Sequence, residues 1–151
     1  MFKDVLVAVD GSPHAEAALD QAIDIARTQG ARLTLITAWQ AFAGWVGLAP
    51  ATAISDDLFA EVEQHARQTL DQAMARVPAA LAPRARLVQG SAADAILSEL
   101  EDSPHDLVVM GSRGRGTVGS LILGSVSLRV LHHAPVPTLI VHLKEDRAAR
   151  A

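Results

Sequence analysis

The chain reads Val108-Val109-Met110-Gly111-Ser112-Arg113-Gly114-Arg115-Gly116, and nine residues separate Gly114 from the pair Gly124-Ser125. A β-branched apolar run that breaks into glycines and a serine, before a helical pattern resumes, predicts a strand, a loop and a helix start. Such a loop can direct backbone N–H groups and a helix N-terminus toward an anion, most often a phosphate. The stretch therefore predicts a nucleotide-binding protein.

Outside this stretch, strand patterns alternate with helix patterns along the chain. Apolar runs predict strands at residues 5–9, 33–38, 106–110 and 138–142, and a weaker pattern predicts another at residues 84–89. Apolar spacing and capping residues predict helices from Pro13 to the residue before Gly30, from Ser55 to Arg76, from Ser91 through Leu100, and over residues 124–133. In the second of these, the predicted buried stripe is Val62, Ala66, Thr69, Leu70 and Ala73.

This alternation predicts an α/β fold with one doubly wound, five-stranded parallel sheet and helices on both faces. We expect a single domain over residues 1–144 and a flexible tail over residues 145–151. In such sheets a ligand binds beyond the carboxyl ends of the strands, where the strand order reverses. Because Asp10 and Gly111 each follow directly after a predicted strand, we expect them to share one crevice.

Composition excludes several classes of protein. The net charge of −4 and the scattering of the 13 Lys and Arg residues argue against electrostatic binding of nucleic acid. The absence of cysteine excludes a disulfide scaffold and a thiolate site. The first residues run into a strand pattern without the arrangement of a signal peptide, which predicts a cytoplasmic protein.

The stretch from Leu33 to Ile54 contains no charged residue, and its length approaches the ~20 apolar residues of a membrane span. It is interrupted by Gly44, Gly47 and Pro50, and it belongs to the regular alternation of strands and helices. We therefore expect a buried strand followed by an apolar loop over residues 39–54, and no membrane partner. This loop either folds over the sheet edge or acts as a lid or a partner-binding patch.

Other nucleotide and metal motifs match poorly. No glycine precedes Lys-Ser or Lys-Thr at the spacing of a phosphate-binding Walker loop. Residues 114–119 fit G-x-G-x-x-G, but they follow the fourth predicted strand and no acid comes ~20 residues later, unlike a dinucleotide site. The neighbouring His132 and His133 would point about 100° apart on a helix, which argues against a shared zinc ion.

The spacing Gly111-x2-Gly114-x9-Gly124-Ser125 resembles that of the universal stress protein family, in its ATP-binding branch. Residues 5–12 resemble the first strand and turn of this family, residues 106–114 its fourth strand and loop, and residues 124–137 its closing helix and the entry to its last strand. The resemblance covers residues 3–143. It implies a Rossmann-like fold of the adenine nucleotide alpha hydrolase-like type.

The resemblance also implies a site for ATP and Mg²⁺. It places Asp10 near the adenosine or a phosphate-bound metal ion, and the backbone of Ala38 at the adenine edge. The loop would line the ribose and inner phosphates with Gly111, Ser112, Gly114 and Arg115, and the helix start would hold the terminal phosphates with Gly124, Ser125 and Ser127. The neighbouring Gly11, Ser12, Met110 and Val126 complete the expected set. Glycine allows close approach of the backbone, and a triphosphate binds Mg²⁺ with few protein ligands.

Simpler roles remain open for these residues. The glycines can serve as turn residues, Ser125 and Ser127 as helix caps, and Asp10 as a turn stabiliser. Arg113 and Arg115 can be solvated charges.

Three functions follow from these observations. The first, which the family resemblance implies, is a regulatory ATP-binding stress protein that acts as a homodimer through its last strand, Thr138–His142, and on a protein partner that the sequence does not identify. The second is a slow ATP-hydrolysing or phosphotransfer enzyme, for which Asp10 is the only obvious acid at the crevice. The third is a dimeric interaction module without nucleotide, against which the intact glycine spacing argues.

Overall fold

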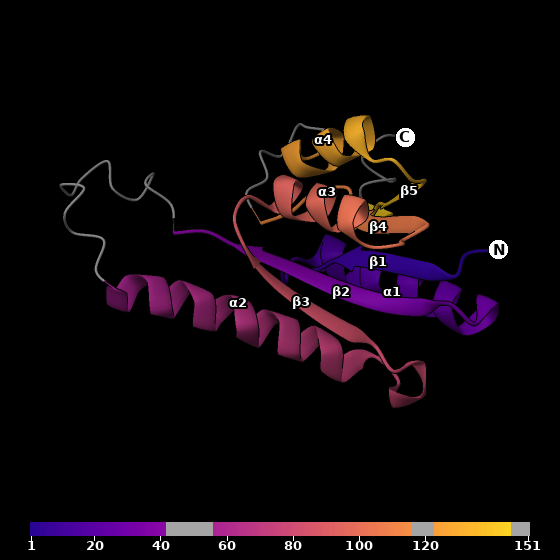
Figure 1. Ribbon diagram of the computed structural model, residues 1–151, viewed down its shortest axis with the longest axis horizontal. Helices are drawn as coiled ribbons and strands as arrows, with labels where there is room; N and C mark the ends of the chain where they lie inside the picture. The colour runs from indigo at the N-terminus through magenta and orange to yellow at the C-terminus, as the bar shows by residue number, and fades with distance from the viewer. Residues whose placement is uncertain (42–55, 116–122, 146–151) are drawn as a thin grey trace.

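A computed structural model describes residues 1–41, 56–115 and 123–145 of the chain. It confirms the predicted fold class (Figure 1). The elements are β1 (Asp4–Ala8), α1 (Pro13–Gln29), β2 (Arg32–Trp39), α2 (Asp56–Arg76), the 3₁₀ helix η3 (Ala79–Leu81), β3 (Arg84–Gln89), α3 (Ala92–Asp102), β4 (Leu107–Gly111), α4 (Ser125–His133) and β5 (Thr138–Val141). Each predicted strand and helix is present, and η3 is the addition.

The five strands form one parallel sheet in the order β3-β2-β1-β4-β5. After β1 the chain builds outward through β2 and β3, and then returns to the other side of β1 to form β4 and β5. At the central strand, Val5 pairs with Leu33 of β2 and with Leu107 of β4. The strand order therefore reverses between β1 and β4, and this is the place where sheets of this kind bind ligands.

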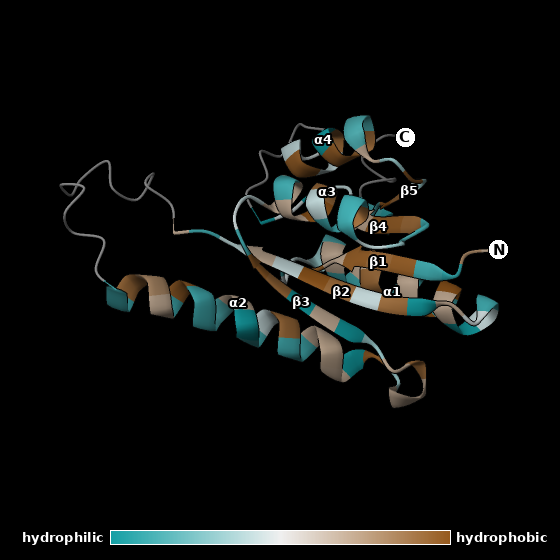
Figure 2. Ribbon diagram, in the orientation of Figure 1, coloured by the Kyte–Doolittle hydropathy of each residue, from teal (hydrophilic) through white to brown (hydrophobic). Residues whose placement is uncertain are grey.

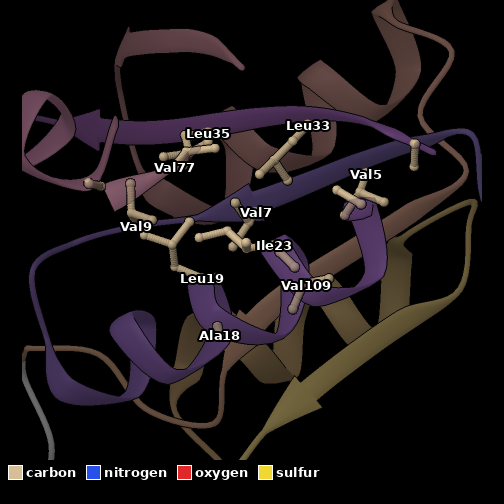
Figure 3. Packing of buried hydrophobic residues seen from close by; sticks show 14 of the residues in the cluster. Val5, Val7, Val9, Ala18, Leu19, Ile23, Leu33, Leu35, Val77 and Val109 are labelled. Carbon is tan, nitrogen blue, oxygen red and sulfur yellow. The ribbon is translucent and has the colours of Figure 1, made fainter. Parts of the chain in front are cut away.

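Consecutive strand residues point to opposite faces of the sheet. Apolar residues therefore lie on both faces, and helices cover each of them. On one face Val5, Val7 and Val9 of the first strand region pack with α1, α2 and the strands beside them (Figure 3). On the other face Leu6 packs with α3 and α4, through residues such as Ile96. Both faces of the central strands are thus buried, and Figure 2 shows these strands as largely hydrophobic beneath helices with polar outer surfaces. This explains why β1 and β4 read as continuous apolar runs.

The predicted buried stripe of α2 is confirmed only in the second half of the helix. Ala66, Leu70 and Ala73 are buried, whereas Val62 and Thr69 are only partly buried. In Figure 1 the first turns of α2 extend beyond the carboxyl end of β3, where none of the strands of the sheet lies against them within the described residues. The helix therefore contributes to the core mainly through its last three turns.

Three expectations fall partly or wholly outside the described residues. They are the apolar loop after Trp39, of which residues 42–54 are not described, the second half of the G-x-G-x-x-G match from Gly116, and the tail over residues 146–151. Within the described ranges, no helix combines the length and the apolar character that a membrane crossing requires.

Candidate functional site

A cleft opens at the carboxyl ends of β1, β2 and β4, on the face that α3 and α4 cover. It contains about 540 Å³ of empty space, including the part that opens to solvent. Its walls come from the strand ends and the first turns of three helices: Ala8, Val9, Asp10, Ala15, Ile36, Ala38, Ala92, Ile96, Met110, Gly111, Arg113, Gly114, Val126 and Ser127. The cleft lies at the reversal of strand order, as the topology predicts.

The structure brings seven of the predicted site residues together as walls of this cleft: Asp10, Ala38, Met110, Gly111, Gly114, Val126 and Ser127. The other six, which are Gly11, Ser12, Ser112, Arg115, Gly124 and Ser125, lie behind or beside these walls. The sequence analysis missed the apolar part of the wall, to which Ala8, Ile36 and Ala92 belong. Their signal was available, because apolar residues at strand ends and at the first turn of a helix face the crevice of such a sheet.

The turn between β1 and α1 is held by its own side chains. Asp10 Oδ1 accepts a hydrogen bond from the backbone N–H of Ser12, at 2.9 Å. Ser12 is buried, and its Oγ caps α1 by accepting from the N–H of Ala15, at 3.2 Å. Gly11 between them has a φ of +80°, a conformation that favours glycine. Asp10 therefore stabilises the turn, and at the same time it lines the cleft.

A Cβ atom at either of two glycines of the predicted loop would meet a close neighbour. A Cβ atom at Gly111 would lie 2.7 Å from the backbone carbonyl carbon of His14, so the end of β4 rests directly on the first turn of α1. A Cβ atom at Gly114 would lie 2.8 Å from Oδ2 of Asp10. Gly111 thus has a packing reason beyond that of an ordinary turn, because its neighbour is backbone, whereas the neighbour of Gly114 is the end of a side chain.

The N-terminus of α4 faces the same loop. Gly124 is the N-cap and supplies no capping side chain, while its N–H donates to the carbonyl of Ser112 at 2.7 Å. The first backbone N–H groups of a helix have no partner within the helix, and they carry the positive end of its dipole. The amides of the first turn, which begins at Ser125, are therefore suited to an anion.

The three serines of this region differ in their bonding. Ser127 is buried, and its Oγ donates to the carbonyl oxygen of Gly111 at 2.8 Å, which ties α4 to β4. The Ser112 hydroxyl is fully buried and has no hydrogen-bond partner among the described residues. Ser125 is exposed at the helix start. A buried hydroxyl without a hydrogen-bond partner costs free energy. The Ser112 hydroxyl is therefore a group to which a ligand, or a movement of the loop, could supply the missing hydrogen bond.

The two arginines of the loop take different positions. Arg113 lines the cleft. Arg115 extends away from it, so that its Nη2 lies 2.7 Å from where a Cβ of Gly11 would be and its Nη1 lies 3.5 Å from Nδ1 of His65 on α2. In this structure Arg115 therefore covers the β1–α1 turn.

Metal-ligating side chains do not gather in the described part of the chain, where no group of three or more His, Asp or Glu residues is close enough to hold an ion. The rings of His132 and His133 have centroids 6.4 Å apart, and Nδ1 of His133 hydrogen-bonds with the carbonyl oxygen of Arg129 at 2.9 Å.

A cluster of paired charges lies at the opposite end of the sheet. Glu99 of α3 is only 6% exposed, and it accepts hydrogen bonds from Arg86 at 2.9 Å and Ser103 at 3.1 Å, with Nε2 of His105 at 3.2 Å. Burial raises the pKa of the Glu99 carboxyl, but the hydrogen bonds from His105, Arg86 and Ser103 together outweigh burial and hold the pKa below its usual value. Glu99 is therefore a charged group that the protein itself satisfies.

Two more carboxylates secure the same end of the sheet. Asp4 of β1 pairs with Arg32 of β2, and the hydrogen bond from Arg32 lowers the pKa of Asp4. Asp106, just before β4, accepts from the backbone N–H groups of Lys3 and Asp4, at 2.8 and 3.0 Å. These contacts join the beginnings of β1, β2 and β4.

Comparison with known proteins gives consistent matches over nearly the whole chain. The model of the Universal stress protein family matches residues 1–142. A universal stress protein from Thermus aquaticus is 38% identical over 144 residues, which cover 93% of this chain and 99% of that protein. Among solved structures, the universal stress protein UspA from Lactobacillus plantarum has a TM-score of 0.77 at 24% identity, and covers 92% of this chain and 97% of its own. A universal stress protein solved in complex with cAMP has a TM-score of 0.65 at 27% identity, with 93% and 97% covered.

Proposed function

The chain belongs to the universal stress protein family, and we propose that it is a regulatory module that binds an adenine nucleotide, ATP with Mg²⁺, in the cleft between β1 and β4. The observation that carries the proposal is the position of this cleft. It joins the apolar ends of the strands to a glycine loop and to the uncapped start of α4, at the reversal of strand order. A relative at 27% identity was solved with cAMP, which supports an adenine nucleotide as the ligand class.

The walls of the cleft offer one surface that suits a base and another that suits a phosphate chain. Ala38, Ile36 and Ile96 give apolar surface that suits a purine ring. Gly114 and the first turn of α4 offer backbone N–H groups and a positive helix end, which suit phosphate oxygens. Mg²⁺ would take most of its ligands from the phosphates and water, with Asp10 as the carboxylate at the cleft.

We infer binding rather than efficient catalysis. Among the described residues that line the cleft, Asp10 carries the only carboxylate, and one of its oxygens accepts a hydrogen bond from the N–H of Ser12. A general base must reach the proton that it removes, and Asp10 is partly committed to its own turn. ATP turnover, where it occurs, should therefore be slow.

We also propose that the protein acts as a homodimer joined along β5. This strand forms one edge of the sheet, and its four residues are each partly exposed. On α4, Leu128 and Leu131 are both 46% exposed. An edge strand needs to be covered, and a second copy of the chain would cover it while burying apolar surface. Sedimentation of the purified protein tests this, since a monomer at micromolar concentration would contradict it.

The nucleotide proposal is tested by identifying what the purified protein carries and what stabilises it. Protein is denatured and any released nucleotide is identified by mass spectrometry; thermal unfolding is then measured with ATP, cAMP or GTP and Mg²⁺. ATP at 100 times its dissociation constant adds ~2.7 kcal/mol of stability. For a chain of this size that raises the melting temperature by roughly 5–10 °C.

A matched pair of variants locates the site. Gly114→Val places a side chain against the Asp10 carboxylate, and we expect it to abolish the ATP-dependent shift while the fold is retained. Ala85→Val, on exposed β3 away from the cleft, should keep the full shift. A flat response of the wild type to ATP and cAMP contradicts nucleotide binding, and a response to cAMP alone contradicts ATP as the ligand. Phosphate release at ~1 s⁻¹ or faster would instead identify an enzyme.

A further inference from the structure

The outer edge of β3 (Arg84–Gln89) has no neighbouring strand in the part of the chain that the structure describes. This strand lies at one end of the sheet order and pairs there with β2 alone (Figure 1). The N–H of Gly90, just after β3, donates to the carbonyl of Trp39 in β2, so the even-numbered residues direct their backbone groups to β2. The N–H and C=O groups of Ala85 and Leu87 therefore point outward, where an added strand could bind them.

The two faces of β3 carry different side chains. Arg84 and Arg86 are two residues apart and point to the same face, on which Arg86 contacts Glu99 of α3. Leu87 points to the opposite face and packs, partly buried, against the core beneath α1 and α2, while Ala85 beside it is exposed. A strand added outside β3 would therefore meet cations on one face and apolar surface on the other.

Both arginines have hydrogen-bond donors left for a partner. Arg84 is exposed and makes no hydrogen bond or ion pair with the described residues. Arg86 is 55% exposed and donates to Glu99 from Nε, so its two Nη groups can still donate to another acceptor.

The space around these arginines is open. They line a groove with about 1160 Å³ of empty space, including the part that opens to solvent. Asp102 also lines this groove, and its carboxylate would repel an acidic partner. It belongs to α3, however, which packs on β2, so a strand added outside β3 would lie on the other side of β3 from it.

We propose that the outer edge of β3 binds an extended segment of a protein partner in which acidic residues alternate with apolar ones. In strand addition, backbone hydrogen bonds give affinity and alternate side chains give specificity. The acidic residues would lie opposite Arg84 and Arg86, with Cβ atoms ~5 Å apart across the two strands, and the apolar residues would cover Leu87. A wholly apolar strand would bury the Arg84 guanidinium without an acceptor, which costs free energy. The two arginines therefore favour acidic segments over apolar ones.

This edge is separate from the other two surfaces to which a role is assigned. β3 and β5 are the opposite edges of the sheet, so a dimer along β5 leaves β3 accessible in both copies. None of the described walls of the nucleotide cleft comes from β3. Peptide binding at β3 and nucleotide binding in the cleft are thus independent, and the failure of one leaves the other standing.

Fluorescence anisotropy with a labelled synthetic peptide that alternates glutamate and valine tests the charge pairing. We expect Arg84→Glu to weaken its binding about tenfold, because opposite charges across the two strands become like charges. The same variant should bind a peptide that alternates lysine and valine more tightly than the wild type does. Arg27→Glu is the control, because it makes the same charge change at an exposed position of α1 and should bind the glutamate peptide within about twofold of the wild type.

Backbone pairing is tested by changing the peptide, so that the result does not depend on the folding of a variant. In an antiparallel pair the backbone groups of the valines would face β3, and in a parallel pair those of the glutamates. N-methylation of one of these two sets should abolish binding to the wild type, and N-methylation of the other should change affinity less than about twofold. The set that abolishes binding also gives the direction of the added strand.

Three results would overturn the proposal. The first is no binding of the glutamate peptide to the wild type, or equal binding to the wild type and to a folded Arg84→Glu. The second is binding that survives both N-methylated peptides, since attachment would then be by charge alone. The third is the appearance in sedimentation of oligomers larger than a dimer that the peptide dissociates, which would assign the edge to a second copy of the chain.

Discussion

The two ends of the parallel sheet use different chemistry to hold their loops. At the amino ends of the strands, carboxylates such as Glu99 and Asp4 are matched by arginines within the protein. At the carboxyl ends, the contacts are mostly backbone hydrogen bonds and close glycine packing, as at Gly111 and Gly124. The carboxylates at the amino ends thus have charged partners within the protein. The carboxyl ends keep a buried serine hydroxyl without a partner and a helix start without a capping side chain.

This difference indicates which end stabilises the fold and which end serves a ligand. Groups that are already paired contribute to folding and have little to offer a ligand. Backbone N–H groups at the carboxyl ends are positioned by the fold and remain available to a ligand. Variants at the two ends should therefore separate stability from binding.

The largest expected effect is that of Gly111→Ala. The added Cβ would lie 2.7 Å from the backbone of His14, which has no flexible end that can move aside. Overpacking of this kind costs ~1–3 kcal/mol, and we expect about 3 kcal/mol here because the clash is with backbone. Urea unfolding measures it. The control is Gly124→Ala, whose Cβ would meet ordinary contacts from 3.4 Å and should cost less than about 1 kcal/mol. Equal losses would contradict the close packing of β4 on α1.

A smaller loss is expected from Glu99→Gln at the amino end. Breaking a buried ion pair costs ~3–5 kcal/mol, but Arg86 is 55% exposed and can be rehydrated, so we expect about 2 kcal/mol. Glu63→Gln is the control, because it breaks an exposed pair with Arg67 and should cost only about 0.3–0.5 kcal/mol. Nucleotide affinity should stay unchanged in both variants. A loss of ATP binding in Glu99→Gln would show that the two ends are coupled.

The stability of the protein at acidic pH should depend on the same cluster of charges, which includes Glu99. The pKa of Glu99 is lowered in the folded protein, so its contribution is complete above its ordinary pKa of 4.5 and is lost as the pH falls through the lower folded value. The pKa of Asp4 is lowered as well, from 3.8, so its loss follows at more acidic pH. Urea midpoints between pH 7 and pH 3 measure this, and Glu99→Gln should show a shallower decline below pH 4.5 than the wild type. Parallel curves for the two proteins would show that Glu99 contributes nothing to the decline.

The fold could be predicted because its signals are local. Most strands are apolar runs that end near residues suited to a turn or a cap, as β1 ends before Asp10 and Gly11. The helix η3 was missed because Ala79–Leu81 has no pattern of its own, and its formation depends on the chain turning between α2 and β3. Hydrophobic periodicity thus predicts the strands and helices that have a sequence pattern of their own.

The candidate site could be predicted only in part. Glycine spacing predicted the cleft, since glycines at a strand end mark a close approach. It could not predict that Ser127 bonds to Gly111, or that Arg115 turns toward His65, because those contacts depend on how distant elements meet. The pairing of Glu99 with Arg86 was missed for the same reason.

The smallest expected effects come from two serines on the same turn of α4, and they sharpen the comparison within the carboxyl end itself. Ser127→Ala removes the buried hydrogen bond to the Gly111 carbonyl and should cost about 1 kcal/mol of stability. Ser125→Ala removes an exposed hydroxyl and should leave stability within about 0.5 kcal/mol. If the start of α4 holds phosphates, Ser125→Ala should still weaken ATP binding, by about three- to tenfold. A loss of stability in Ser125→Ala, with ATP affinity intact, would make this serine part of the fold and remove it from the ligand site.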